Sequence, residues 1–467
     1  SPGQSSPTSR AERLTSALEE CSGDFVCFLD ADNVVYPGAL AELAGAVAGS
    51  NQADVCYGGE DEARLSRTGS LQWRRSPFFK PAWNPELLRS LPYLGHLTLL
   101  RTSLVRQLGI RALPGAEIWD LHLRVTDRAR RIVCVPGIVA GRVDGRPTVA
   151  LAASAAIESL QQDAAVHGRP DAVVGTHRGT WLTRFPVAGA PLVSIVIPSK
   201  NQLDVVRRCV TSLLEVTTYV TYEVVLVDTG STDEAVWDWY GTVADVHPEF
   251  RVVSWPEQPF SYARSCNAGA AAAKGDVLVM LNNDTEIVAP QWLDLLVGEV
   301  QNPEVGSVGA LLLYPDGHTI QHAGISVGIR GAAGNALAGL AVAGRLTRTQ
   351  SVMLNSRHAM TALTAACLAI RADVFADVGG FDEQFRVTFN DVDLGCRLTA
   401  RGLRNVYRPD VTLLHHESLS VGVAQSRDWD ELYAAAALLR DRWPELVARD
   451  PHFNPLLSRQ SETFRLP

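Results

Sequence analysis

Lysine is almost absent from this sequence of 467 residues, in which only Lys80, Lys200 and Lys274 occur. Arginine therefore carries nearly all of the positive charge, and it is mixed along the chain with a larger number of acidic residues, for a net charge of −9. A protein that binds nucleic acid through its phosphates needs a basic block, and the sequence has none. We therefore expect no nucleic-acid partner.

Long hydrophobic runs are also absent. A helix that crosses a bilayer needs about 20 apolar residues in succession, and the alanine-rich stretches 150–156 and 332–344 are too short or are broken by glycine. The first residues do not have the pattern of a signal peptide. These absences predict no transmembrane segment and favour a cytoplasmic protein, with only peripheral contact at the inner face of the cell membrane.

Cysteine pairs with CxxC spacing are missing as well, which argues against a structural zinc site or a thioredoxin-like site. Most of the cysteines lie in apolar runs and are expected to act as small buried hydrophobic residues in a reducing compartment. The sequence contains eight of them: Cys21, Cys27, Cys56, Cys134, Cys209, Cys266, Cys367 and Cys396.

The length and composition predict an ordinary globular protein of two domains. A chain of 467 residues exceeds a typical single core, and a hydrophobic fraction of 46% is normal for a globular protein. Changes in composition suggest five parts: a disordered start at 1–9, a first domain at 10–175, a linker at 176–190, a second domain at 191–425, and a C-terminal helix with a tail at 426–467.

The second domain has three short apolar runs, at 192–198, 222–227 and 277–281, each followed by polar residues. Helical patterns separate these runs, and this alternation predicts an α/β fold with a doubly wound, mostly parallel sheet. Parallel strands would bring the polar loops that follow them to one edge of the sheet, where ligands bind in such folds. Asp228 could then accept hydrogen bonds from a base or ribose, while the Asn282–Asp284 turn could hold a metal and a diphosphate.

A simpler interpretation of each loop remains open. Polar and acidic residues often follow a buried strand only to form a turn, and in the loop after 222–227 either Ser231 or Thr232 could cap the next helix. The glycine-rich stretch 328–334 does not have the GxGxxG spacing of a dinucleotide site, so we expect a flexible loop there.

Two further groups could carry chemistry. Asp391 and Asp393 lie at the start of a predicted helix, where one carboxylate could serve only as a cap and the two should point in different directions. His415 and His416 end a predicted strand and could be metal ligands or simply hydrogen-bonded imidazoles.

Taken together and in order, the segments 193–198, 227–233, 281–284, 379–383, 390–393 and 415–418 resemble the inverting GT-A glycosyltransferases of family 2. The likeness is greatest to the bacterial rhamnosyltransferase-like enzymes of surface-polysaccharide synthesis. The resemblance implies a GT-A fold and a catalytic base at Asp391. It implies that Asp284 and one of His415 and His416 bind Mn²⁺ or Mg²⁺. It also implies nucleotide-sugar binding by Pro198, Ser199, Asp228, Asn267, Asn282 and Asn283.

The function that follows is a metal-dependent inverting transfer of rhamnose or another hexose from a dTDP- or UDP-linked donor to a polysaccharide or lipid-linked glycan. A carboxylate must remove the proton of the acceptor hydroxyl, and a cation stabilises the leaving diphosphate. The alternative is a non-catalytic protein that binds nucleotide sugars or glycans, because Asn282 stands where the family has an acidic residue.

The first domain resembles the same family in a degenerate form. Its stretch 23–33 contains Asp30-Ala31-Asp32 after a predicted strand, but Ile118 aligns with the base, and no histidine lies near 139–142. The nucleotide-binding strands expected before Arg10 are not in the sequence. We expect a truncated, non-catalytic GT-A-like domain that serves as a scaffold or binds acceptor glycan.

Overall fold

The structure is a computed structural model that describes residues 9–144, 151–256, 259–416 and 429–467. The chain divides into two compact units. The first unit comprises Ser1–Thr183, Leu346–Ser356 and Phe453–Leu457, and the second comprises Arg184–Arg345, Arg357–His452 and Ser458–Pro467. The division after Thr183 falls inside the stretch predicted as a linker, but that stretch is partly ordered by a hairpin of β7 (Val173–His177) and β8 (Thr180–Arg184).

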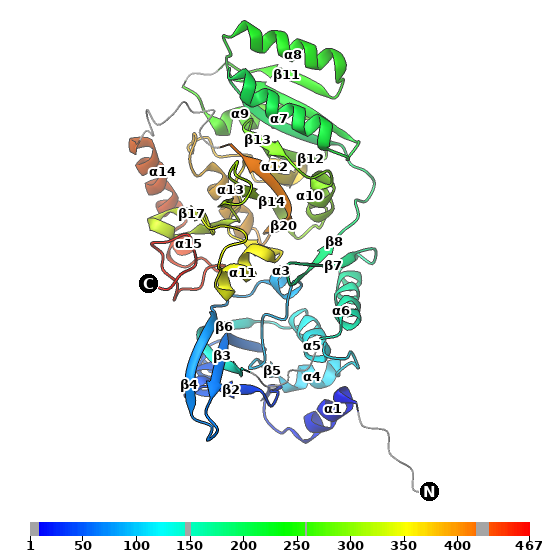
Figure 1. The fold of residues 1–467 in the computed structure, drawn as a ribbon, viewed down its shortest axis with the longest axis vertical. Coiled ribbons are helices and arrows are strands. Elements are labelled where there is room, and N and C mark those ends of the chain that lie inside the picture. The colour runs from blue at the N-terminus through cyan, green and yellow to red at the C-terminus, as the bar shows by residue number, and fades with distance from the viewer. Residues whose placement is uncertain (1–8, 145–150, 257–258, 417–428) are drawn as a thin grey trace. The chain divides into compact units, whose positions relative to one another are not determined.

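The second unit is built on a ten-stranded sheet with the order β11-β10-β9-β12-β19-β14-β20-β13 (Figure 1). The pairs β11–β10, β10–β9 and β9–β12 are all parallel, as predicted, whereas β19 is antiparallel to both of its neighbours. The strands on this path are β9 (Val193–Ser199), β10 (Tyr222–Asp228), β11 (Phe250–Ser254), β12 (Val277–Leu281), β13 (Thr285–Ile287), β14 (Val305–Leu313), β19 (Cys367–Arg371) and β20 (Arg404–His415). Off this path, β15 (Ile320–His322) pairs with β14 and β18 (His358–Met360) with β20.

Helices cover both faces of this sheet because alternate residues of each strand point to opposite sides. Val193, Ile195 and Ile197 of β9 belong to the apolar core that also contains residues of α7 (Leu203–Val216), α8 (Glu234–Val246) and α10 (Trp292–Val300). Val196 faces the other side, beneath α9 (Tyr262–Ala272). There a Cβ on Gly269 would lie 2.3 Å from Val196 Cγ1, so only glycine allows the helix to approach so closely. The sheet is thus doubly wound.

The rest of the second unit includes the helix that carries Asp391 and Asp393 and the C-terminal helices. The predicted helix that ends before Gly402 is present as α13, and the predicted C-terminal helix is present as α14. The glycine-rich stretch near residue 330 forms a short 3₁₀ turn and a strand, so it is more ordered than predicted. The remaining elements are β16 (Ile325–Val327), η1 (Ile329–Gly331), β17 (Ala333–Asn335), α12 (Ala372–Asp377), α13 (Asn390–Ala400), α14 (Trp429–Arg442) and α15 (Pro444–Ala448).

The first unit contains a six-stranded sheet with the order β1-β5-β3-β6-β2, and β4 pairs with β3. Along this order the adjacent strands pair in the orientations antiparallel, antiparallel, parallel and antiparallel. The strands β12-β19-β14-β20-β13 of the second unit pair in the same four orientations, in the same order. The tandem repeat predicted from sequence therefore reappears in the strand topology. The strands are β1 (Phe25–Val26), β2 (Asn33–Val35), β3 (Val55–Leu65), β4 (Leu71–Phe78), β5 (Leu99–Arg101) and β6 (Ile132–Val143).

Several elements of the first unit differ from the sequence expectation. The stretch from Ser76 to Pro92 contains the end of β4 and a short helix, and the long strand β6 was not predicted from the sequence. Ser9 begins α1 with a capping box to Glu12, while residues 1–8 of the predicted disordered start lie outside the described residues. The helices are α1 (Arg10–Glu20), α2 (Ala39–Ala48), α3 (Pro85–Leu88), α4 (Thr102–Leu108), α5 (Glu117–Thr126) and α6 (Ala153–Val166), joined by α11 (Arg348–Asn355) from later in the chain.

Within the described parts of the chain, no helix is long and apolar enough to span a membrane.

Candidate functional site

The carboxyl ends of three parallel strands meet at one edge of the second unit's sheet. Asp228, the last residue of β10, pairs in register with Ser199, the last residue of β9, and Pro198 precedes Ser199 opposite Val227. The side-chain amide of Asn283, just beyond β12, donates a hydrogen bond of 3.2 Å to Ser199 Oγ. The three polar loops therefore lie together, as the sequence predicted.

The carboxylate of Asp228 is fully buried and shapes its own loop. Its Oδ1 accepts hydrogen bonds from the backbone N–H groups of Gly230 (3.0 Å) and Ser231 (2.8 Å), and its Oδ2 accepts from the hydroxyls of Ser231 and Tyr240. The next helix, α8, is capped by Asp233, so the expectation that Ser231 or Thr232 forms this cap is wrong. A direct contact between Asp228 and a nucleotide stays a prediction.

The Asn282–Asp284 turn lies against His415 at the end of β20. Asp284 Oδ1 lies 2.9 Å from His415 Nε2, and Asn282 Nδ2 lies 3.3 Å from the same nitrogen. The other ring nitrogen, Nδ1, lies 2.6 Å from the side-chain oxygen of Gln321. Asp284 and His415 are both buried, so a carboxylate oxygen and an imidazole nitrogen face each other away from bulk solvent.

The residues of this turn fit a divalent cation. Within the described chain, Asn282 Oδ1 is buried and has no hydrogen-bond partner, and a buried carbonyl oxygen without a partner is costly unless a ligand satisfies it. Asp284 Oδ1 and His415 Nε2 face each other, and oxygen and imidazole nitrogen donors of this kind suit Mn²⁺ or Mg²⁺. In the observed orientation the amide nitrogen of Asn282 faces His415, so its oxygen would join the set after rotation of the amide. The amide at position 282 therefore still supplies an oxygen, although not a charge.

His416 has different partners. Its Nε2 lies 2.9 Å from Glu286 Oε2 and its Nδ1 lies 3.0 Å from the guanidinium of Arg208. Both ring nitrogens are thereby engaged away from the Asp284 side chain, and the contact of His416 with Asp284 is a main-chain one, from the N–H of His416 to the backbone carbonyl of Asp284. Of the two histidines, the geometry favours His415 as the ligand. Glu417 and Ser418 of the same motif lie outside the described residues.

Asp391, the predicted base, lies in the first turn of α13. Its Oδ2 accepts the N–H of Ala365 at 3.1 Å and its Oδ1 accepts the N–H of Val392 at 2.8 Å. Burial raises the pKa of Asp391 above the ordinary aspartate range, although these hydrogen bonds act in the opposite direction. A carboxylate with a raised pKa is a better proton acceptor, which suits a general base.

Asp393 is a structural residue. It is fully buried, its Oδ2 accepts from Arg397 Nε at 2.7 Å, and its Oδ1 accepts from Trp443 Nε1 at 2.9 Å and from Arg442 at 3.1 Å. These partners differ entirely from those of Asp391, which agrees with the expectation that the two carboxylates point in different directions.

A short segment before β19, Thr364–Ala366, connects the parts of the site, and sequence reasoning missed it. The N–H of Ala365 binds Asp391, the carbonyl of Ala365 accepts the hydroxyl of Tyr262 at 3.1 Å, and the carbonyl of Ala366 accepts the N–H of Asn282 at 3.1 Å. The contacts are made by main-chain groups of small residues, so no motif could have indicated them.

Tyr262 lies close to both key carboxylates. Burial raises the pKa of its hydroxyl well above the ordinary value, and the neighbouring Cys266 and the carboxylates of Asp391 and Asp284 reinforce the shift. The same ring packs edge-on against Phe381, with ring centroids 6.2 Å apart. Because Ala365 binds both Tyr262 and Asp391, and the adjacent Ala366 binds Asn282, the predicted base and the Asn282–Asp284 turn lie in one neighbourhood.

Asn267 uses both ends of its side chain to hold the turn after α12. Its Oδ1 accepts the N–H of Phe381 and its Nδ2 donates to the carbonyl of Phe381, each at 2.9 Å. The observed contacts are thus to the Gly379–Glu383 turn, and a role at the diphosphate or sugar stays a prediction.

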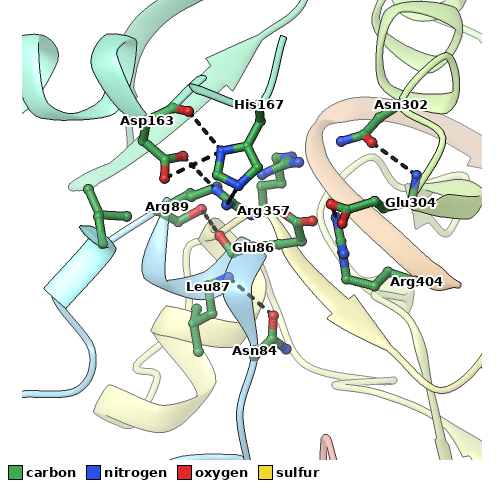
Figure 2. Close-up of polar contacts among 12 residues, drawn as sticks. Asn84, Glu86, Leu87, Arg89, Asp163, His167, Asn302, Glu304, Arg357 and Arg404 are labelled. Atoms are coloured by element: carbon green, nitrogen blue, oxygen red, sulfur yellow. Dashed lines mark hydrogen bonds and ion pairs between the residues drawn. The ribbon is translucent and has the colours of Figure 1, made fainter. Parts of the chain in front are cut away.

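A second cluster of potential metal ligands lies in the first unit. Among the described residues, Asp127, Asp163 and His167 bring their ligand atoms within 4.8 Å of one another. Arg89 lies among them, with Nε 2.7 Å from Asp163 Oδ2 and Nη2 3.3 Å from His167 Nε2 (Figure 2). Because a guanidinium already neutralises the carboxylates, we interpret this cluster as an ion-pair network.

The pairing registers identify the first unit's counterpart of the site. Phe25 pairs with Arg101 in the first unit, and Val277 pairs with Arg371 in the second, so Phe25 and Val277 are equivalent positions. Asp30-Ala31-Asp32 and Asn282-Asn283-Asp284 follow these positions at the same distance along the chain and therefore correspond. Asn33 pairs with Arg142 as Thr285 pairs with His415, so arginine replaces the candidate ligand.

The helices correspond as well. Asp120 pairs with Arg124, whose guanidinium binds the carbonyls of Leu108 and Gly109. Asp393 pairs with Arg397, whose guanidinium binds the carbonyls of Val378 and Gly380. With these two pairs aligned, Ile118 takes the place of Asp391, as the sequence predicted.

The chain belongs to the Glycosyl transferase family 2, whose profile matches residues 10–109 and 194–371. The first matched segment lies in the first unit, and the second lies in the second unit except for Leu346–Ser356. The chain therefore belongs to the family that the resemblance in the sequence predicted.

Among particular proteins, the chain is 36% identical to the O-antigen biosynthesis protein RfbC of Myxococcus xanthus over 97% of its own length and 35% of that protein. It is 33% identical to the uncharacterized protein y4gI of Sinorhizobium fredii, over 98% of the chain and 51% of that protein. Over 32% of the chain and 49% of the relative, it is 32% identical to an N-acetylglucosaminyl-diphospho-decaprenol L-rhamnosyltransferase of Mycobacterium tuberculosis. The chain thus spans only about a third to a half of the length of these relatives.

Proposed function

We propose that the second unit catalyses a metal-dependent, inverting transfer of a hexose from a nucleoside diphosphate sugar to a glycan acceptor. The observation that carries this proposal is the grouping of Asp284, His415 and Asp391 around Tyr262 and the Thr364–Ala366 segment. Asp284 and His415 offer ligands for a cation, and Asp391 offers a partly buried base.

In the proposed reaction, Asp391 accepts the proton of the acceptor hydroxyl while the hydroxyl oxygen forms a bond to the anomeric carbon of the donor. The bond from that carbon to the diphosphate oxygen breaks, and the nucleoside diphosphate leaves with the electron pair. A divalent cation, when bound by Asn282, Asp284 and His415, stabilises the negative charge of the leaving group. A single displacement inverts the anomeric carbon, so one base is sufficient.

The nucleotide is proposed to lie across the ends of β9, β10 and β12, near Pro198, Ser199, Asp228 and Asn283. We propose dTDP-rhamnose or a UDP-hexose as the donor. The acceptor is proposed to be a lipid-linked or growing surface polysaccharide. The partial relative named as an L-rhamnosyltransferase and the O-antigen biosynthesis relative support this choice, and such an acceptor would bring the protein to the inner face of the membrane.

The test is a panel of dTDP-, UDP- and GDP-sugars, each assayed with and without Mn²⁺ for thermal stabilisation of the native protein and of Asp284→Asn. A ligand that binds only the folded state raises the melting temperature. We expect stabilisation by one donor class that needs Mn²⁺ and is lost in Asp284→Asn. Stabilisation that is equal in both proteins would refute the proposed site, and transfer assays with the active donor would then identify the sugar.

A further inference from the structure

The side chain of Gln321 is buried beside the candidate ligand His415. It belongs to β15, which pairs with β14, and only 4% of the residue is exposed. Its Oε1 lies 2.6 Å from His415 Nδ1. An amide oxygen accepts hydrogen bonds and cannot donate them, so this contact places the proton of the neutral ring on Nδ1.

The position of that proton decides what the other nitrogen can do. With Nδ1 protonated, Nε2 carries a lone pair directed toward Asp284 Oδ1 at 2.9 Å and Asn282 Nδ2 at 3.3 Å. A metal requires this lone pair, and in metal sites the hydrogen bond to the remote ring nitrogen commonly sets the ring's tautomer and orientation.

We propose that Gln321 is a positioning residue that holds His415 in the metal-binding tautomer and orientation. This inference rests on the proposed function, because it assumes that the second unit binds a divalent cation through Asp284 and His415. Gln321 itself supplies no ligand atom and touches no reacting group.

The experiment measures Mn²⁺ affinity in the absence of nucleotide by electron paramagnetic resonance, for native protein and for Gln321→Met, Gln321→Leu and Gln321→Glu. The apolar variants should bind Mn²⁺ about 10–100-fold more weakly, the usual cost of losing an outer-shell partner. Gln321→Glu should retain native affinity, because its carboxylate also accepts from Nδ1–H. At saturating Mn²⁺ the kcat of the apolar variants should recover toward the native value.

Unchanged affinity in a folded Gln321→Met protein would overturn the inference, as would a Gln321→Glu protein that binds as weakly as the apolar variants. The second result would mean that the amide donates to His415 instead of accepting. Failure of the proposed function looks different, because native protein would then bind Mn²⁺ no better than Asp284→Asn does.

In the first unit, three charged side chains form a cluster at positions where the second unit has neutral residues. Arg10 binds Asp30 at 2.8 Å and Glu117 at 2.9 Å, and all three side chains are largely buried, Glu117 to 4% exposure. His96 Nδ1 also lies 3.5 Å from Asp30. The registers make Tyr262, Asn282 and Asn390 the respective counterparts of Arg10, Asp30 and Glu117 in the second unit.

We infer that the first unit is a closed copy of the site, in which the guanidinium of Arg10 supplies the positive charge that a metal would otherwise provide. The cation ligand His415 is replaced there by Arg142, and the base Asp391 by Ile118. The guanidinium of Arg10 offsets one of the two carboxylate charges, which leaves a net charge of −1 and weakens their attraction for a divalent ion.

The test compares the full protein with Arg10→Met, and with Arg10→Met combined with Asp30→Asn and Glu117→Gln. Arg10→Met should lower the melting temperature because it leaves the buried carboxylate of Glu117 and the partly buried carboxylate of Asp30 without their cation, and the neutralised triple variant should recover much of the loss. An unchanged melting temperature in Arg10→Met, or no recovery in the triple variant, would overturn the inference. So would a loss of bound Mn²⁺ in the single variant Asp30→Asn, since a closed site binds none.

Discussion

Two isosteric substitutions, Asp391→Asn and Asp393→Asn, should have opposite effects although the residues are two positions apart. Asp391 accepts two main-chain N–H groups and carries a charge that burial disfavours. Asparagine keeps one acceptor oxygen and removes that charge, so we expect little change in stability. The base is lost, however, and kcat should fall by about 10²–10⁴-fold, the usual contribution of general base catalysis.

Asp393→Asn should instead lower the stability of the protein. The fully buried carboxylate lies 2.7 Å from Arg397 and 3.1 Å from Arg442, and loss of one partner from a buried ion pair costs about 3–5 kcal/mol because the remaining charge is uncompensated. For a domain of this size, each kcal/mol corresponds to roughly 2–4 °C in Tm. We therefore expect a fall of roughly 6–20 °C, with kcat reduced far less at temperatures where the variant is folded.

The assay pairs differential scanning calorimetry with initial rates of sugar transfer for native protein and both variants. If Asp391→Asn transfers sugar at the native rate, Asp391 is not the base. If it lowers Tm as much as Asp393→Asn does, then its main role is structural and the division of roles between the two carboxylates fails. Native protein should also lose kcat as the pH falls through a pKa above the ordinary aspartate range, because the protonated carboxyl cannot accept a proton.

Three further results are expected. His415→Gln should weaken Mn²⁺ binding in a titration, whereas His416→Gln should leave it unchanged, since His416 is engaged by Glu286 and Arg208; the reverse order would exchange their roles. Gly269→Ala should cost about 1–3 kcal/mol in urea unfolding because the new Cβ would meet Val196 at 2.3 Å, and a neutral result would mean that α9 can shift. The hydrogen bond with Asp127 is the main cause that raises the pKa of His167 to about 9, above its ordinary value of about 6.5. The resulting stabilisation is complete below about pH 6.5 and is lost as pH rises through about 9. The free energies of unfolding of native protein and His167→Gln should therefore differ by about 1 kcal/mol at pH 6 and converge above pH 9. A difference that grows with pH would contradict the ion-pair interpretation.

The sequence predicted the parallel part of the second unit's sheet well because its signals are local. The apolar runs that became β9, β10 and β12 have the length and composition of buried parallel strands, and their boundaries agree with the structure to within a residue or two. Their parallel arrangement follows from the alternation with helices, and it brought Ser199, Asp228 and Asn283 to one edge.

The remaining features depend on contacts between distant parts of the chain. The long strand β6 was missed because its proline and glycines, Pro136, Gly137 and Gly141, weaken a strand pattern that pairing with β3 stabilises. The choice between His415 and His416 depends on which imidazole faces Asp284. The Thr364–Ala366 segment acts through main-chain groups, which carry no side-chain signal. The domain limits and the truncation of the first unit stay predictions.

The most direct test of the proposed site is an anomalous-scattering crystal structure of the protein with Mn²⁺ and a nucleoside diphosphate. We predict one strong manganese peak within coordination distance of Asp284 and His415 Nε2, with the diphosphate beside it and Asp391 facing the same space. A peak at Asp127, Asp163 and His167 instead, or none near Asp284 while the nucleotide is bound, would contradict the proposal.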